Sequence, residues 1–72
     1  MKRIEAHIED GGEITIGPIG SIECVATASD AETCLVMLVR RENESFNALL
    51  KRLDKAIGTA AESGDCIDEV NG

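Results

Sequence analysis

Aromatic residues are almost absent from this 72-residue chain, which has no tryptophan, no tyrosine and a single phenylalanine, Phe46. Because aromatic side chains supply the largest buried areas, the core has to be built from aliphatic residues. A chain of this length buries only about 60% of its unfolded surface, so the core is thin. Such a core contributes about 3 to 5 kcal/mol, and we expect oligomerisation to add to it.

Positive charge is also scarce, since seven Lys and Arg residues stand against 14 Asp and Glu residues, a net charge of -7. A surface of this sign repels phosphate backbones and anionic lipids, so we expect neither nucleic acid nor a membrane as a direct partner. No apolar run approaches the roughly 18 residues of a membrane span, and no secretory signal is visible. Small secreted proteins that depend on disulfides usually have an even number of cysteines, and this chain has three. We therefore expect a cytoplasmic protein.

The N-terminal part of the chain alternates apolar and polar residues. Ile4, Ala6 and Ile8 recur at every second position, which predicts a half-buried first strand. The segment 10–12, Asp-Gly-Gly, has residue types that strongly favour a tight turn. The alternation resumes over 14–16 and predicts a short second strand. The only proline, in the segment Gly-Pro-Ile-Gly that follows, is expected to break this strand.

Two further strands are predicted over 22–28 and 33–39, joined by a turn at 29–32. With the turn centred on residues 30 and 31, Ala26 lies opposite Leu35. In this register the small side chains of the third strand share a face with Leu35 and Met37. The opposite face carries the apolar residues Val25, Val36 and Leu38.

The convincing helix of the sequence begins after Ser45, a good N-cap residue, and ends at Ser63 and Gly64. Its apolar residues recur at spacings of three and four and form one stripe, made of Phe46, Leu49, Leu50, Leu53, Ile57 and Ala60. A rod of this kind covers one face of the sheet, and we expect it on the face with Ala26 and Ala28. Gly58 in its interior suggests either a close backbone approach or a weak last turn.

The stretch 33–39 is apolar on both sides, so the second face also needs a cover. We expect a copy of the same chain there, with Val25, Val36 and Leu38 in a homodimer interface. Two alternatives remain open. The first hairpin folds across this surface, or three scattered apolar side chains are tolerated in water.

The resulting fold class is α+β, with a three- or four-stranded antiparallel meander sheet and one C-terminal helix packed on one face. A single domain spans 1–64, and an acidic tail spans 65–72. The tail carries Ile67 and Val70. Either it is a frayed terminus, or it docks these two side chains on its own sheet edge or on another protein, and both join the candidate interface.

Motifs for catalysis or cofactor binding are missing. His7 and Glu9, with Asp10 next to them, offer at most a weak half-site for a metal ion. Cys24 and Cys34 are interpreted as small core residues, and the carboxylates around Cys66 disfavour a thiolate nucleophile there. We therefore predict no enzyme, no cofactor and no metal.

The leading hypothesis is a small, acidic, cytoplasmic protein-binding module without catalysis, assembled as a homodimer. The alternative is an antitoxin-like regulatory protein that binds a basic partner, motivated by the small size, the acidity and the tail. A small metal-dependent enzyme centred on His7 ranks last.

Overall fold

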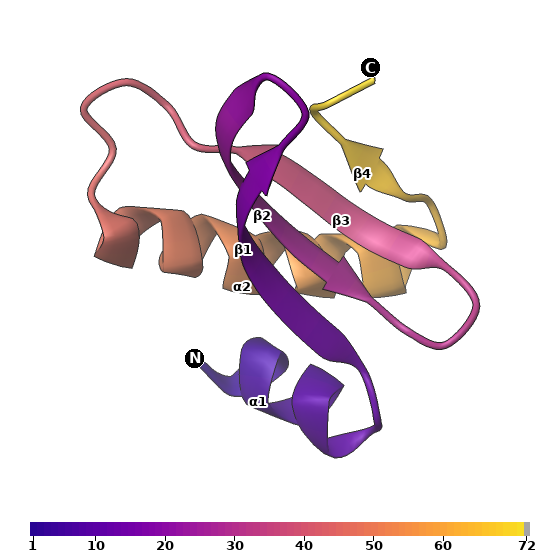
Figure 1. The fold of residues 1–72 in the computed structure, drawn as a ribbon. Coiled ribbons are helices and arrows are strands. Elements are labelled where there is room, and N and C mark those ends of the chain that lie inside the picture. Colours follow the sequence, from indigo (N-terminus) through magenta and orange to yellow (C-terminus); the bar gives the residue numbers. More distant parts are fainter. Residues whose placement is uncertain (72) are drawn as a thin grey trace.

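The computed structural model describes residues 1–71 and has the predicted α+β architecture, a sheet with a long helix packed on it, together with a short helix at the N-terminus (Figure 1). Four strands form the sheet in the order β1-β2-β3-β4, antiparallel except for the last pair. The elements are α1 (Lys2–Glu9), β1 (Glu13–Ile19), β2 (Ile22–Ser29), β3 (Cys34–Val39), α2 (Phe46–Ser63) and β4 (Ile67–Asp68).

Helix α2 has the bounds that the sequence predicts, because both of its ends carry local signals. The Ser45 hydroxyl accepts a hydrogen bond from the backbone N–H of Ala48 at 3.0 Å. At the other end Gly64 adopts a left-handed conformation with φ 76° and donates its N–H to the carbonyl of Ala60. Leu49 and Leu53 are fully buried against the sheet, whereas Phe46, predicted in the same stripe, is 51% exposed at the first turn.

The first predicted strand is wrong, because residues 2–9 form helix α1. Ile4 and Ile8 are four residues apart, so they also fit one side of a helix. The N-terminus of α1 is capped from α2, since the Asp54 carboxylate accepts hydrogen bonds from the backbone N–H groups of Arg3 and Ile4, both at 3.0 Å. The ring Nε2 of His7 lies 2.8 Å from the Ser29 carbonyl oxygen and ties α1 to β2.

The two helices lie on the same side of the sheet (Figure 1). The side chains of the sheet that pack against the helices define its inner face, and those that alternate with them define its outer face. The inner face holds Ile14, Ile16, Ala26, Ala28, Val36 and Leu38. The outer face holds Thr15, Gly17, Val25, Thr27, Met37 and Val39.

The register between β2 and β3 differs from the predicted one. Ala26 lies opposite Leu38 rather than Leu35, and Ala28 lies opposite Val36. A bulge at Leu35 shifts the pairing next to the loop. Because side chains alternate with period two, the corrected register moves Val36 and Leu38 to the inner face.

The β1–β2 hairpin also contains an irregularity. Pro18 does not end β1, since pairing continues to Ile19 opposite Ile22 with a register shift after Gly17. In Figure 1 the end of this hairpin curls up on the side of the sheet away from α2. The bulge lets the strand pass the proline and increases its local twist.

Candidate functional site

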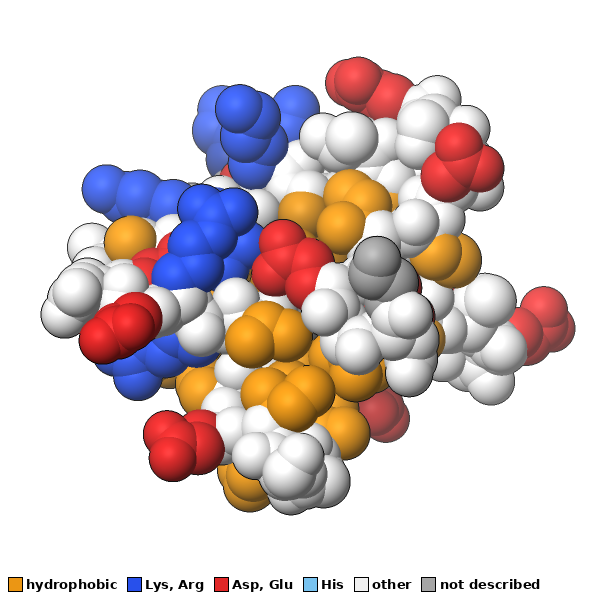
Figure 2. All heavy atoms as spheres, turned by 90° about the horizontal axis from the view of Figure 1, so that it is seen from above, with side chains coloured by type: hydrophobic (Ala, Val, Ile, Leu, Met, Phe, Trp, Pro, Cys, Tyr) orange, Lys and Arg blue, Asp and Glu red, His pale blue; other side chains and the backbone are white. Residues whose placement is uncertain are grey.

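The outer face of the sheet is the candidate functional site, because neither α1 nor α2 covers it. Figure 2 shows the side chains of the molecule seen from above. Apolar side chains lie in separate groups near the middle of this view, basic side chains gather on the left, and acidic side chains are spread over the centre and the rim.

The centre of the outer face is tightly packed although no helix lies on it. Val25 is 1% exposed and Thr27 is 8% exposed. The hydroxyl groups of Thr15 and Thr27 form a hydrogen bond across the two strands. Met37 and Val39, which flank this centre on β3, remain half-buried and therefore present apolar surface to water.

The structure does not bring the five residues of the predicted interface together on an open surface. Val36 and Leu38, 0% and 3% exposed, lie in the core under α2, so their predicted place on the free face is wrong. Val25 is on the outer face as predicted, but its neighbours already cover it. Ile67 of β4 pairs with Val36 of β3 and packs against the core. Val70 follows β4 and is half-buried.

The C-terminal segment docks on the edge of its own sheet, one of the predicted alternatives. The Glu69 N–H donates to the Met37 carbonyl at 2.8 Å, and the Glu69 carboxylate accepts from the Val39 N–H at 2.9 Å. Arg52 of α2 also contacts this carboxylate and donates to the Val39 carbonyl at 2.9 Å. Arg52 therefore links α2, β3 and the tail.

The Arg52 guanidinium has a second carboxylate partner. Glu44, in the loop before α2, lies 2.7 Å from it, and the side chain of Glu44 is only 8% exposed. The hydrogen bond from Arg52, together with the Arg41 N–H, lowers the pKa of Glu44 to about 2. These two ion pairs, Glu44–Arg52 and Arg52–Glu69, are the ones present among residues 1–71.

The two ends of the outer face differ in charge. Glu13 at the start of β1 and Asp30 and Glu32 in the β2–β3 loop are acidic and lie at one end, and that loop contains no Lys or Arg. Arg40 and Arg41 follow β3 at the other end, where the loop before α2 runs (Figure 1). Glu23 and Glu42 are close to these arginines, so the arginine end is near neutral while the other end is strongly acidic.

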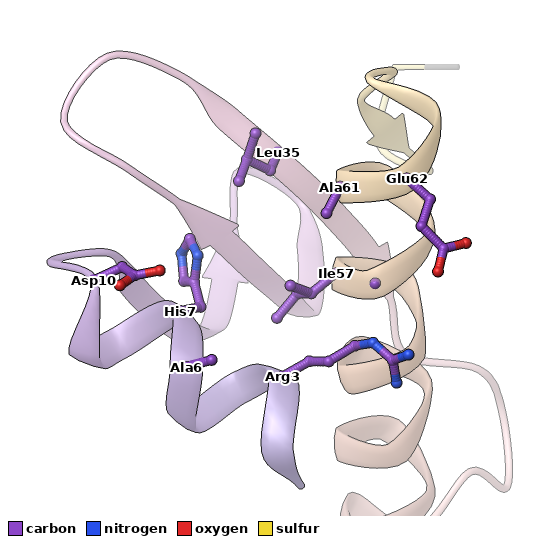
Figure 3. Close-up of a pocket in the computed structure, with 9 residues that line it drawn as sticks. Arg3, Ala6, His7, Asp10, Leu35, Ile57, Ala61 and Glu62 are labelled. Carbon is purple, nitrogen blue, oxygen red and sulfur yellow. The ribbon is translucent and has the colours of Figure 1, made fainter.

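A groove of about 340 Å³ separates α1 from α2 and β3. Figure 3 shows its apolar floor, which includes Leu35 and Ile57. The charged side chains around it do not converge, because Asp10 lies at one end, while Arg3 and Glu62 extend at the other. This groove is the packing seam of α1, and its geometry offers no paired groups for acid–base chemistry.

Gly58 lies on the α2 side of this seam. A Cβ atom there would overlap the flexible side chain of Arg3, so the glycine leaves room for this side chain between α1 and α2. His7, the proposed metal ligand, faces the Ser29 carbonyl instead. Within residues 1–71 the structure shows no group of three His, Cys, Asp or Glu side chains that could hold a metal ion.

Sequence reasoning missed Met37 and Val39 as surface residues, since it placed both of them under the helix. The signal that could have corrected this is the length of the β2–β3 connection. The Asp30 carboxylate accepts from the N–H groups of Glu32 and Thr33, which closes a longer turn than the one assumed.

In the described part of the chain, neither helix is long and apolar enough to cross a membrane. Comparison with protein-family models, with curated proteins and with solved structures finds no match to the chain.

Proposed function

We propose that the chain is a small non-catalytic binding module whose outer sheet face binds a second copy of itself. The observation that carries this proposal is the half-exposed apolar surface of Met37 and Val39 on the one face of the sheet that no helix covers. The core lies on the other face and is built from aliphatic side chains alone. Association would bury further apolar area, which a chain of this size needs.

The charges at the two ends of the face favour a self-complementary arrangement. A two-fold axis that lies in the interface and runs across the strands brings each acidic end against the arginine end of the other copy. Glu13 and Glu32 then meet Arg40 and Arg41. With a net charge of -7 on each chain, this arrangement separates the strongly acidic ends from one another.

The first test is the oligomeric state of Met37→Lys, measured by sedimentation velocity over a range of concentrations. Asp68 lies opposite Met37 in the register and can pair with the new lysine, so the monomer fold is expected to persist. A charge at the centre of an apolar interface is costly to bury, and we expect a monomer. Ile8→Lys on α1, where the residue is 52% exposed, is the matched control and should sediment like the wild type.

A charge exchange tests the orientation. The variants Arg40→Glu/Arg41→Glu and Glu13→Lys/Glu32→Lys should each self-associate less than the wild type, and their mixture should recover a heterodimer. Circular dichroism checks that each variant folds. A wild type that stays monomeric at high concentration refutes the proposal. A mixture that stays monomeric although the wild type is a dimer refutes the orientation.

The alternative of an antitoxin-like regulator was motivated by the small size, the acidity and a tail able to wrap a basic partner, and it stays a prediction. Residues 67–69 are paired with β3 and with Arg52, so the tail supports this alternative less than the size and the acidity do. The cytoplasmic location and the absence of catalysis stay predictions.

A further inference from the structure

Two of the three thiols lie at one edge of the sheet. Cys34 opens β3, and Cys66 immediately precedes β4, which pairs with β3 in parallel. Both residues are exposed, whereas Cys24 on β2 is half-buried and packs against the core.

Both of these thiols belong to the outer face. Cys34 lies opposite Ser29, the neighbour of the inward-facing Ala28, so Cys34 faces outward. Cys66 is the neighbour of Ile67, which lies opposite the inward-facing Val36, so Cys66 also faces outward. Leu35, the extra residue of the bulge, packs against the core.

The spacing suits a disulfide. Val36 pairs with Ile67, so Cys34, two residues before Val36, and Cys66, one residue before Ile67, are offset by one residue along the strands. In regular strands about 4.8 Å apart, with a rise of about 3.3 Å per residue, an offset of one residue corresponds to a Cα separation of about 5.8 Å. Disulfides form when this separation is between roughly 4.4 and 6.8 Å.

We propose that Cys34 and Cys66 form a reversible disulfide that fastens β4 to β3. The tail is otherwise held by a two-residue strand and by the contacts of Glu69 with β3 and Arg52. Oxidation would therefore make the attachment of the C-terminal segment covalent, and reduction would return it to these few non-covalent contacts.

The oxidant is a low-molecular-weight disulfide such as glutathione disulfide. One cysteine thiolate attacks one of its sulfur atoms, the bond between its two sulfurs breaks, and one thiolate leaves with the electron pair. The second cysteine thiolate then attacks the protein sulfur of the mixed disulfide and releases the second glutathione thiolate. The two protons of the protein thiols end on the two glutathione molecules, which balances the exchange.

The surroundings of Cys34 disfavour its thiolate. Partial burial raises the pKa of the Cys34 thiol, and the nearby Asp68 and Cys66 act in the same direction, although the Val36 carbonyl opposes them. Cys34 therefore ionises with difficulty. Either cysteine can make the first attack, and the other then closes the disulfide.

The test oxidises the full-length chain at low concentration with glutathione disulfide and maps the products by mass spectrometry without reduction. Trypsin leaves Cys24 and Cys34 in one peptide, 4–40, so a glutamate-specific protease is required. It separates Cys24 in 24–32, Cys34 in 33–42 and Cys66 in 63–69. We expect the last two peptides to be linked, and the Glu69 amide to exchange more slowly after oxidation.

Three variants complete the experiment. Cys24→Ser should give the same linked peptides, Cys34→Ser should accumulate glutathione on Cys66, and Cys66→Ser should accumulate it on Cys34. Met37→Lys should form the same link, which separates this proposal from the dimer proposal. Separate glutathione adducts on Cys34 and Cys66 without a link, a link through Cys24, or a link only between two chains would overturn it.

Discussion

The cap that α2 provides to α1 can be removed with a single substitution, Asp54→Ala. The Asp54 carboxylate accepts two backbone hydrogen bonds at 3.0 Å, from Arg3 and Ile4, at the positive end of the α1 dipole. Loss of an N-cap costs about 0.5 to 2 kcal/mol, and loss of a charge at the helix end about 0.3 to 1 kcal/mol. We expect the free energy needed to open α1 to fall by about 1 to 2 kcal/mol.

This loss should be local to α1. None of the residues of α1 is fully buried, so the helix can open without the rest of the chain. Alanine also has a higher helix propensity than aspartate inside α2, worth up to about 0.7 kcal/mol, which opposes the loss in global stability. Hydrogen exchange of individual amides is therefore the suitable assay. The backbone N–H of Asp10, which donates to the Ala6 carbonyl, is a reporter for α1.

The amides of α1 should exchange about tenfold faster for each 1.4 kcal/mol lost, while those of β2 and β3 keep the wild-type rate. Asp54→Asn keeps an acceptor oxygen and should show a smaller acceleration. Lys55→Ala, an exposed neighbour on α2, is the matched control. Wild-type exchange rates throughout α1 in Asp54→Ala would refute the role of this carboxylate as a cap.

Two further predictions concern Glu44 and Gly58. Because the pKa of Glu44 falls from an ordinary value of 4.5 to about 2, its ion pair with Arg52 contributes stability above pH 4.5 and loses it as the pH falls through 2. Glu44→Gln should thus be less stable than the wild type at pH 7 and equally stable below pH 2, as denaturant titrations would show. Gly58→Ala should stabilise α2 by up to about 1 kcal/mol, as thermal melting would show. The new methyl group should also displace the flexible Arg3 side chain and thereby accelerate hydrogen exchange of the α1 amides. A difference in the free energy of unfolding between Glu44→Gln and the wild type that is the same at pH 7 and below pH 2 would contradict the first expectation. Wild-type exchange rates of the α1 amides in Gly58→Ala would contradict the second.

The sequence by itself determined the elements whose signals are local. Helix α2 begins at a Ser45 cap and ends at Gly64, and the alternation in β2 and the apolar run of β3 are sufficient to define two strands. The α+β class followed from these elements. The aliphatic composition of the core also followed, because only one aromatic residue is present.

Tertiary structure decided what local signals leave ambiguous. Ile4, Ala6 and Ile8 fit period two, but Ile4 and Ile8 also fit a helical turn, and the cap that selects the helix comes from Asp54, 50 residues away from Ile4. The register of β3 depends on the Asp30 turn and on the bulge at Leu35, and these determine which of its faces is buried. Since strand side chains alternate, an odd-numbered change of register exchanges core and surface, which is why Val36 was predicted on the surface and Met37 in the core.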